Sequence, residues 1–192
     1  MGAARRKRLA AVTAPTLRKL DFGCGPHKRE GFEGVDQYPF PGVDHVFDIR
    51  GVWPWPDNSV TEAHASHFIE HLTAAERTHF VNELYRVLVP GGTCQIIVPH
   101  WCSNRAYGDP THQWPPVSEM WFFYILRSWR LAQAPHTDQS VFPTGFSCDF
   151  DATYGYAMRP DLVTRHPDVQ QAAFLKEKEA VQDIMATLTK RA

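Results

Sequence analysis

The chain of 192 residues contains no apolar run of 18 residues, so the sequence predicts no membrane-spanning helix. Cysteine is scarce, and no two of the four cysteines have the Cys-x-x-Cys spacing. An excess of one charge is also absent, because 20 Lys and Arg residues accompany 21 Asp and Glu residues. The net charge of −1 gives no general attraction to nucleic acid or anionic lipid. These absences favour a protein of the reducing cytoplasm.

One strongly basic segment lies near the start of the chain. Four adjacent cations, Arg5 to Arg8, can contact phosphates. The chain as a whole is not basic, which favours a solvated tail over a nucleic-acid contact. No apolar segment of signal-peptide length follows these cations. We therefore expect a flexible basic arm over residues 1–16 and a cytoplasmic location.

The remaining length and composition suit one folded domain. The hydrophobic content of 43% is enough for one sizeable core, and 192 residues make two full domains unfavourable. We expect a single domain over residues 17–192.

The segment Leu20–Pro26 places two glycines one residue apart after a strand-like run. Gly23 and Gly25 permit φ > 0 and remove the Cβ atoms that would keep a ligand away, while successive N–H groups can point at an anionic group. Two further apolar runs end in carboxylates, at Asp36 and at Asp48. A carboxylate at the end of the second strand is suited to hydrogen-bonding a ribose diol. This pattern indicates a nucleotide-type site.

Two more motifs follow in order, Pro54-Trp55-Pro56-Asp57-Asn58-Ser59-Val60 and Pro90-Gly91-Gly92. With the glycine loop and the two carboxylates, the chain resembles the class I S-adenosylmethionine-dependent methyltransferases over residues 18–100. The resemblance implies an α/β fold, a doubly wound, mostly parallel Rossmann-like sheet with an antiparallel C-terminal strand. It also implies S-adenosyl-L-methionine as the cofactor. One departure is the first crossover, because only 11 residues lead from Gly25 to Asp36 and a parallel connection normally needs a dozen or more.

Alternating strand and helix patterns agree with this fold. Thr73 and Glu76 form a capping box, and apolar residues recur at helical spacing from there to Pro90. Ser118 is the expected N-cap of a later helix. The expected strands are 17–22, 34–36, 45–48, 60–65, 93–98, 146–158 and 186–189, and the expected helices are 74–89, 118–129 and 168–183.

The resemblance implies roles for nine residues around the cofactor. They are Asp21, Gly23, Cys24 and Gly25 around the methionine part, Asp36 at the ribose hydroxyls, Asp48 at the adenine amino group, Ile49 against the ring, and Ser66 and His67 near the substrate opening. Structural interpretations stay open for some of them. The glycines suit a plain tight turn, Asp48 suits a turn cap, and Trp53 and Trp55 suit core packing.

The segment His67-Phe68-Ile69-Glu70-His71 matches the His-x-x-Glu-His pattern of a zinc protease, with His64 a turn upstream. Two histidines four apart on a helix can share one metal. Glu-His-Leu after a fourth strand is also common in the methyltransferase family, where Glu70 and His71 would orient the floor of the cofactor site. We expect no metal here.

A loop after the fifth expected strand carries Asp109-Pro110-Thr111-His112, similar to loops in small predicted methyltransferases, several of them phage-encoded. Asp109 and His112 are candidates for an oriented base, and Trp101, Tyr107 and Trp114 for stacking on a flat acceptor. The alternative is a lid with no chemistry. We interpret residues 100–130 as a substrate-side loop and lid segment.

The resulting hypothesis is methyl transfer from S-adenosylmethionine to an acceptor that is a small molecule, nucleobase, sugar or protein. The runners-up are a non-catalytic cofactor-binding partner subunit and a zinc metallohydrolase that uses the His67–His71 segment. The sequence does not define the oligomeric state.

Overall fold

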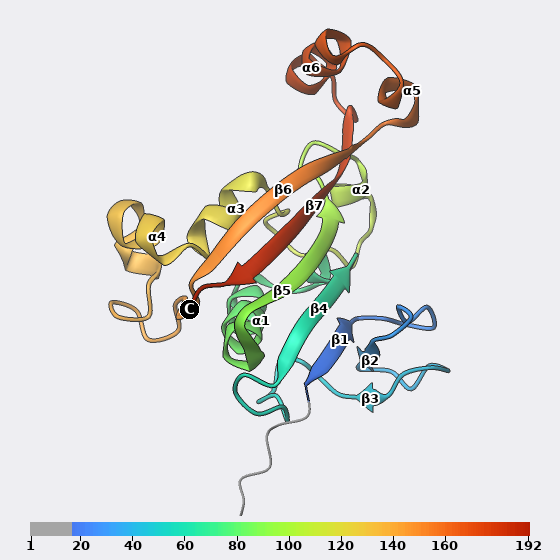
Figure 1. Ribbon diagram of the computed structural model, residues 1–192. Coiled ribbons are helices and arrows are strands. Elements are labelled where there is room, and N and C mark those ends of the chain that lie inside the picture. The colour runs from blue at the N-terminus through green and yellow to red at the C-terminus, as the bar shows by residue number, and fades with distance from the viewer. Residues whose placement is uncertain (1–16) are drawn as a thin grey trace, which may run out of the picture.

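The computed structural model describes residues 17–192, so the basic segment Arg5–Arg8 lies outside the described residues. Seven strands form one sheet in the order β3-β2-β1-β4-β5-β7-β6 (Figure 1). The strands are β1 (Arg18–Phe22), β2 (Glu33–Asp36), β3 (His45–Val46), β4 (Val60–Ser66), β5 (Leu88–Pro99), β6 (Phe150–Met158) and β7 (Val181–Lys190). The α-helices are α1 (Ala74–Val87), α2 (Arg105–Gly108), α3 (Glu119–Tyr124), α4 (Arg127–Gln133), α5 (Pro160–Val163) and α6 (Pro167–Lys176).

The strand order reverses at β1, as in a doubly wound sheet. From β1 the chain builds β2 and β3 on one side and then returns to place β4 and β5 on the other. The strands β1 to β5 pair in parallel, whereas β7 is antiparallel to both β5 and β6. The predicted Rossmann-like fold with an antiparallel C-terminal strand is confirmed.

The crossover from β1 to β2 contains no helix, as its small number of residues predicts. Turns and bends replace a helix between Gly23 and Phe32. The Asp21 carboxylate accepts a hydrogen bond from the Arg29 N–H at 2.8 Å and therefore ties the loop to the end of β1.

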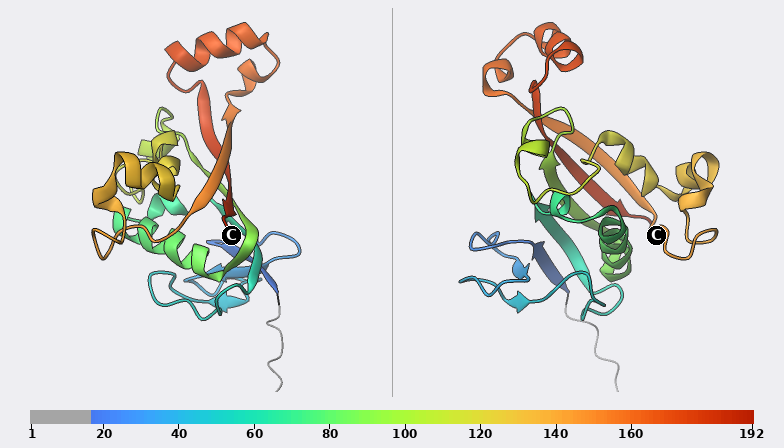
Figure 2. Two further views of the ribbon diagram at one scale, coloured as in Figure 1. Left: turned by 60° about the vertical axis from the view of Figure 1, so that its left-hand side comes forward. Right: turned by 180° about the vertical axis from the view of Figure 1, so that it is seen from behind.

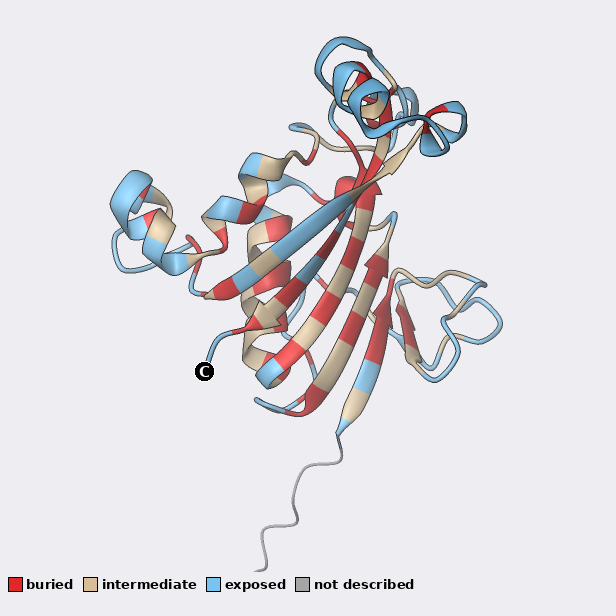
Figure 3. Cartoon of the chain, turned by 45° about the horizontal axis from the view of Figure 1, so that its top comes forward, coloured by how far each residue is buried: buried red, intermediate tan, exposed pale blue. Residues whose placement is uncertain are grey.

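Helices that pack along the sheet lie on one of its faces. Figure 2 shows α1, α3 and α4 on the same side of the sheet. On β4, Ala63 and Ala65 are buried beneath these helices, while His64 and Ser66 are only partly buried. The same alternation runs along the neighbouring strands (Figure 3). Among residues 17–192, the short crossovers therefore leave the other face without helical cover.

Helix α1 begins with the predicted capping box. The Thr73 hydroxyl accepts from the Glu76 N–H, and the Glu76 carboxylate accepts from the Thr73 N–H at 2.8 Å. On its inner face Phe80 contacts the ring of Phe22 edge-on, with centroids 5.3 Å apart.

Trp53 and Trp55 pack in the same aromatic core and are 3% and 4% exposed. Both residues belong to the core, as the core-packing interpretation predicts.

Two predicted helices have different bounds in the structure. The expected helix 118–129 is divided into α3 and α4, because Leu126 is extended (φ −88°, ψ 109°). Ser118 holds the N-cap position of α3 without a capping hydrogen bond from its side chain. The expected helix 168–183 ends at Lys176, and residues 181–183 instead begin β7. Pairing with β5 and β6 on both sides outweighs the helical pattern there.

None of the described helices has the length and apolar character needed to cross a bilayer. Cys94 and Cys148 are buried, Cys24 and Cys102 are partly buried, and all four are free thiols.

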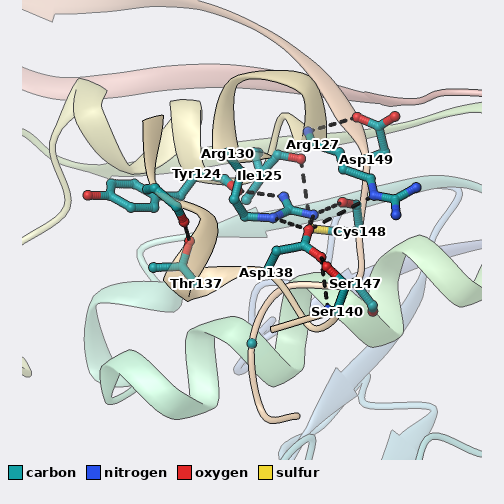
Figure 4. Close-up of polar contacts among 12 residues, drawn as sticks. Tyr124, Ile125, Arg127, Arg130, Thr137, Asp138, Ser140, Ser147, Cys148 and Asp149 are labelled. Atoms are coloured by element: carbon teal, nitrogen blue, oxygen red, sulfur yellow. Dashed lines mark hydrogen bonds and ion pairs between the residues drawn. The ribbon is translucent and has the colours of Figure 1, made fainter. Parts of the chain in front are cut away.

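A buried ion pair fastens α4 to the loop before β6 (Figure 4). The guanidinium of Arg130 is fully buried and donates to Asp138 at 2.8 Å, to the Tyr124 carbonyl at 2.7 Å and to the Cys148 carbonyl at 3.0 Å. The other Asp138 oxygen accepts from the Ser140 N–H and hydroxyl. Every charged group in this cluster therefore has partners, which is the condition for keeping charges inside a protein.

Asp138 should make the protein sensitive to acid. Burial raises its pKa, but hydrogen bonds from Ser140 and Arg130 outweigh burial and lower the pKa from 3.8 to about 2. The ionised Asp138 carboxylate therefore makes its full contribution to the free energy of unfolding above pH 4, and this contribution is lost as the pH falls toward 2. We expect about 2 kcal/mol of unfolding free energy to disappear over this range. Urea unfolding at pH values between 5 and 2 measures this loss. In the Asp138→Asn variant the free energy of unfolding should depend less steeply on pH. Equal slopes in the two proteins would contradict this role.

Candidate functional site

A cavity of about 400 Å³ opens where β1, β2 and β3 end and where the chain leaves β4. Open α/β sheets bind ligands at this edge, beside the point where the strand order reverses. Five of the nine predicted cofactor residues line the cavity, namely Gly23, Asp36, Asp48, Ile49 and His67. His71, which the resemblance placed at the floor of the cofactor site, also lines the cavity, and lining residues without a predicted role include Tyr38, Phe40, Phe47 and Arg50.

Asp36 ends β2 with its carboxylate at the cavity. One oxygen accepts the Gly25 N–H at 2.9 Å, and the other accepts the Tyr38 N–H at 2.9 Å. Each carboxylate oxygen has two lone pairs, so both oxygens can still accept a hydrogen bond from a ligand. Asp36 is thus fixed by the backbone and able to receive a vicinal diol.

The glycine loop differs from the expected anion cradle. The N–H groups of Gly23 and Cys24 both donate to the carbonyl of Val35, and the Gly25 N–H donates to Asp36. None of these three N–H groups is free for an anionic group. The cradle interpretation is therefore wrong for these three N–H groups. The loop contributes to the site through the course of its backbone and not through hydrogen-bond donors.

Gly23 has a positive φ of 63°, and an added Cβ would lie 2.3 Å from the ring of Phe68. Phe68 can therefore approach the end of β1 and form one wall of the cavity only because position 23 has no side chain. Gly25 also has a positive φ, of 51°, but a Cβ there would meet open space. The two glycines serve different purposes.

Four predicted cofactor residues, Asp21, Cys24, Gly25 and Ser66, are not among the residues lining the cavity. Asp21 is buried and contacts the imidazole of His64 at 2.7 Å as well as the crossover loop. The Cys24 side chain packs where a Cβ on Gly34 would otherwise lie. Burial raises the pKa of the Cys24 thiol to about 11. Asp21 and Cys24 thus support the loop behind the cavity.

Asp48 and Ile49 line the cavity from the segment that follows β3. The Asp48 carboxylate accepts from the Arg50 N–H at 3.0 Å and from its guanidinium at 2.7 to 3.0 Å. Asp48 therefore caps the turn that follows β3, while it also lines the cavity. Ile49 and Phe47 add apolar surface beside it, which suits a flat ring.

The His67–His71 segment does not have the arrangement of a zinc protease. His67 leaves β4 with a positive φ of 50°, and only Ile69–His71 form a single 3-10 turn. The two histidines consequently do not lie one turn apart on an α-helix. The neighbouring carboxylate of Glu70 raises the pKa of His67.

Glu70 is 4% exposed, and neither of its oxygens accepts a hydrogen bond from a described residue. Its nearest cationic neighbour is His67, whose Nδ1 is 3.3 Å from Oε1. A buried carboxylate without hydrogen bonds is costly, and the resemblance did not predict it.

The predicted pair Asp109 and His112 is not joined by a hydrogen bond, since Nε2 of His112 lies 3.9 Å from the carboxylate. Asp109 instead accepts from the N–H and the hydroxyl of Thr111. His112 uses Nδ1 toward the Ala106 carbonyl at 3.3 Å. Its ring lies 4.8 Å from the ring of His71, which lines the cavity. The loop therefore brings His112 beside the cavity-lining residue His71 without orientation by Asp109.

Arg77 is the functional residue that the sequence analysis missed. Its guanidinium is 2% exposed and donates to the carbonyls of Ile69, Glu70, Gln113 and Pro115. Burial lowers its pKa. One side chain from α1 thus clamps the Asp109–Pro116 loop against the turn that follows β4.

Comparisons with known proteins agree with this geometry. A family model described as a methyltransferase domain matches residues 35–96. No curated protein sequence matches the chain. A SAM-dependent methyltransferase from Archaeoglobus fulgidus is 21% identical, with a TM-score of 0.61 over 92% of this chain and 86% of that one.

Two further structures have lower similarity. The YcgJ protein from Bacillus subtilis is 13% identical, with a TM-score of 0.51 over 95% of both chains. Geranyl diphosphate C-methyltransferase from Streptomyces coelicolor, solved with S-adenosyl-L-homocysteine, is 15% identical, with a TM-score of 0.50 over 93% of this chain and 74% of that one. At these sequence identities, the similarity to the three structures is a similarity of fold.

The fold and the site thus define an α/β protein of the class I methyltransferase architecture. With the family match, they support the prediction that the chain is a S-adenosylmethionine-dependent methyltransferase with S-adenosylmethionine as its cofactor.

Proposed function

We propose that S-adenosylmethionine binds in the cavity beside β1, β2 and β3 and that its methyl group is transferred to an acceptor held by the Asp109–Pro116 loop. The observation that carries this proposal is the convergence of five predicted cofactor residues on one cavity that His71 also lines, with the ring of His112 4.8 Å from the ring of His71. The absence of disulfides among the four thiols favours a cytoplasmic location.

The cofactor orientation follows from the chemistry of the lining. Asp36 accepts from the ribose hydroxyls, and the adenine ring lies against Ile49 with its amino group toward Asp48. The methionine end then extends past Gly23 toward His67. In this orientation the sulfonium methyl group emerges near His71 and the loop that Arg77 holds.

The acceptor side favours a flat molecule. Trp114 on the loop is 77% exposed, and Trp101 and Tyr107, which are 47% and 55% exposed, line a second pocket that Phe174 also lines, although large aromatic side chains usually lie at least partly covered. Aromatic rings exposed beside a cavity offer stacking surface to a ligand. This surface is compatible with a nucleobase or an aromatic small molecule.

Methyl transfer from a sulfonium is an in-line displacement, so most of the catalysis is positioning. A near-attack geometry can supply about 7 to 11 kcal/mol of barrier reduction. Proton removal from the acceptor adds roughly 10²- to 10⁴-fold. We propose that His112 accepts this proton through Nε2, since Nδ1 faces the Ala106 carbonyl.

Asp36→Ala should weaken binding of S-adenosylhomocysteine by about 10- to 100-fold, because hydrogen bonds to a charged group contribute about 1.5 to 3 kcal/mol. Isothermal titration calorimetry measures this. Asp161→Ala is the control, because Asp161 is an exposed partner of Arg159 beyond the end of β6. Affinity that is unchanged in Asp36→Ala would remove this carboxylate from the site.

A non-catalytic cofactor-binding subunit is the rival proposal, and transfer of labelled methyl groups separates the two. We expect the protein to transfer label from methyl-tritiated S-adenosylmethionine to one class in a panel of nucleic acids, proteins, sugars and aromatic metabolites. Tight cofactor binding with no transfer to any class would favour the subunit.

A further inference from the structure

Glu70, His71 and His112 bring three metal-ligand groups together at the part of the cavity that His71 lines. One donor atom from each residue lies within 4.8 Å of the other two. Glu70 and His71 come from the turn after β4, whereas His112 comes from the loop after β5, about 40 residues later. The buried clamp of Arg77 holds these two segments together.

The Glu70 carboxylate is desolvated and only partly compensated. Both of its oxygens are buried without a hydrogen bond, and although Nδ1 of His67 lies 3.3 Å from Oε1, Oε2 has no partner among the described residues. The Asp109 carboxylate on the loop differs, because it accepts two hydrogen bonds from Thr111. Glu70 therefore has coordination capacity that the described protein groups leave unused.

Both histidines have the surroundings that metal-binding histidines usually have. Nδ1 of His112 faces the Ala106 carbonyl at 3.3 Å, which leaves Nε2 as the free donor. Nδ1 of His71 lies 2.9 Å from the Thr111 hydroxyl, which in turn donates to Asp109. Such partners on the second ring nitrogen fix the tautomer and the ring orientation of a ligating histidine.

We propose that Glu70, His71 and His112 bind one divalent transition-metal ion of the zinc type. Two imidazoles and one carboxylate form a known donor set for zinc and non-haem iron, with room for further ligands. Zinc bonds to these donors are about 2.0 to 2.2 Å, so the side chains must close on the ion, and the exposed side chain of His71 is the one with room to move toward it. The site differs from the His67–His71 zinc-protease pattern and from the expectation of no metal.

The position of the ion bears on the acceptor, and this step rests on the proposed function. A metal beside the emerging methyl group would bind an acceptor hydroxyl and lower its pKa. The hydroxyl proton leaves to water, the oxygen lone pair forms the bond to the methyl carbon, and the electrons of the carbon–sulfur bond remain on sulfur as S-adenosylhomocysteine forms. With the metal bound, the role of ligand replaces the role of proton acceptor proposed above for His112, because a coordinated Nε2 has no lone pair for the proton.

The test is a zinc titration of the full chain after treatment with a chelator. We expect one Zn²⁺ per chain with a dissociation constant of about 1 µM or below, and a visible absorption band when Co²⁺ replaces it. Glu70→Gln keeps the size of the side chain and should weaken binding by at least about tenfold, as should His112→Ala. His136→Ala is the control, because His136 is exposed on the 3-10 turn after α4 and should leave the titration unchanged.

Absence of stoichiometric zinc, or zinc binding that survives both Glu70→Gln and His112→Ala, would overturn the metal proposal. Circular dichroism of each variant excludes misfolding as the cause of a loss. S-adenosylhomocysteine titrated into the same preparations keeps the two proposals distinct. A protein that binds S-adenosylhomocysteine but fails to bind zinc refutes only the metal site. A protein that binds zinc but fails to bind S-adenosylhomocysteine refutes only the proposed function.

Discussion

His112→Ala should lower the rate of methyl transfer by roughly 10²-fold or more and leave the affinity for S-adenosylhomocysteine within about twofold. The His112 imidazole lies on the loop, 4.8 Å from the ring of His71, and does not line the cavity itself. Its removal therefore affects the acceptor or its proton while the cofactor contacts stay in place. The expectation holds whether His112 takes the proton directly or binds a metal.

The measurement is label transfer to the acceptor class found in the panel, with His136→Ala as the matched histidine control. Trp114→Ala should behave differently and raise the KM for the acceptor through lost stacking, because the indole is 77% exposed. A His112→Ala enzyme with normal turnover would show that the loop is only a lid.

Gly23→Val should weaken binding of S-adenosylhomocysteine by about 100-fold or more. The backbone at position 23 is left-handed, and a Cβ would lie 2.3 Å from the Phe68 ring. A β-branched side chain opposes the positive φ and also displaces a wall of the cavity.

Comparison of Gly23→Ala with Gly25→Ala separates the effect of backbone strain from the effect of displacing the Phe68 ring. Both alanines are placed at a positive φ, which costs about 1 to 2 kcal/mol, but only the one at position 23 meets another atom. We expect Gly23→Ala to lose at least about tenfold more affinity than Gly25→Ala, by calorimetry on variants whose unfolding temperatures are also measured. Equal losses would mean that Phe68 plays no part in forming the site.

The sequence predicted the strands and α1 because local signals and tertiary packing agree there. The capping box at Thr73 and the apolar spacing of Phe80 and Leu84 point to the same helix that packs on the sheet. The same signals failed for residues 181–183, where pairing with two strands outweighs a helical pattern.

The candidate site was predictable where a residue ends a strand, as Asp36 does, since side chains at strand ends meet at one edge. The hydrogen-bond partners of the backbone N–H groups in the glycine loop could not be predicted. Whether the N–H groups at Gly23 and Gly25 are free depends on the positions of Val35 and Asp36 across the sheet.

Arg77 left a signal that could have been used. It lies three residues before Phe80 and four before Val81, on the apolar face of α1. A charged residue at such a position needs buried partners, but the sequence does not say that they are the carbonyls at residues 69, 70, 113 and 115.

Calorimetric titration of the purified, chelator-treated protein with S-adenosylhomocysteine tests the central claim most directly. We predict saturable binding of one molecule per chain without added metal, weakened in Asp36→Ala and unchanged in Asp161→Ala. A folded protein that shows no binding at millimolar S-adenosylhomocysteine would contradict the account.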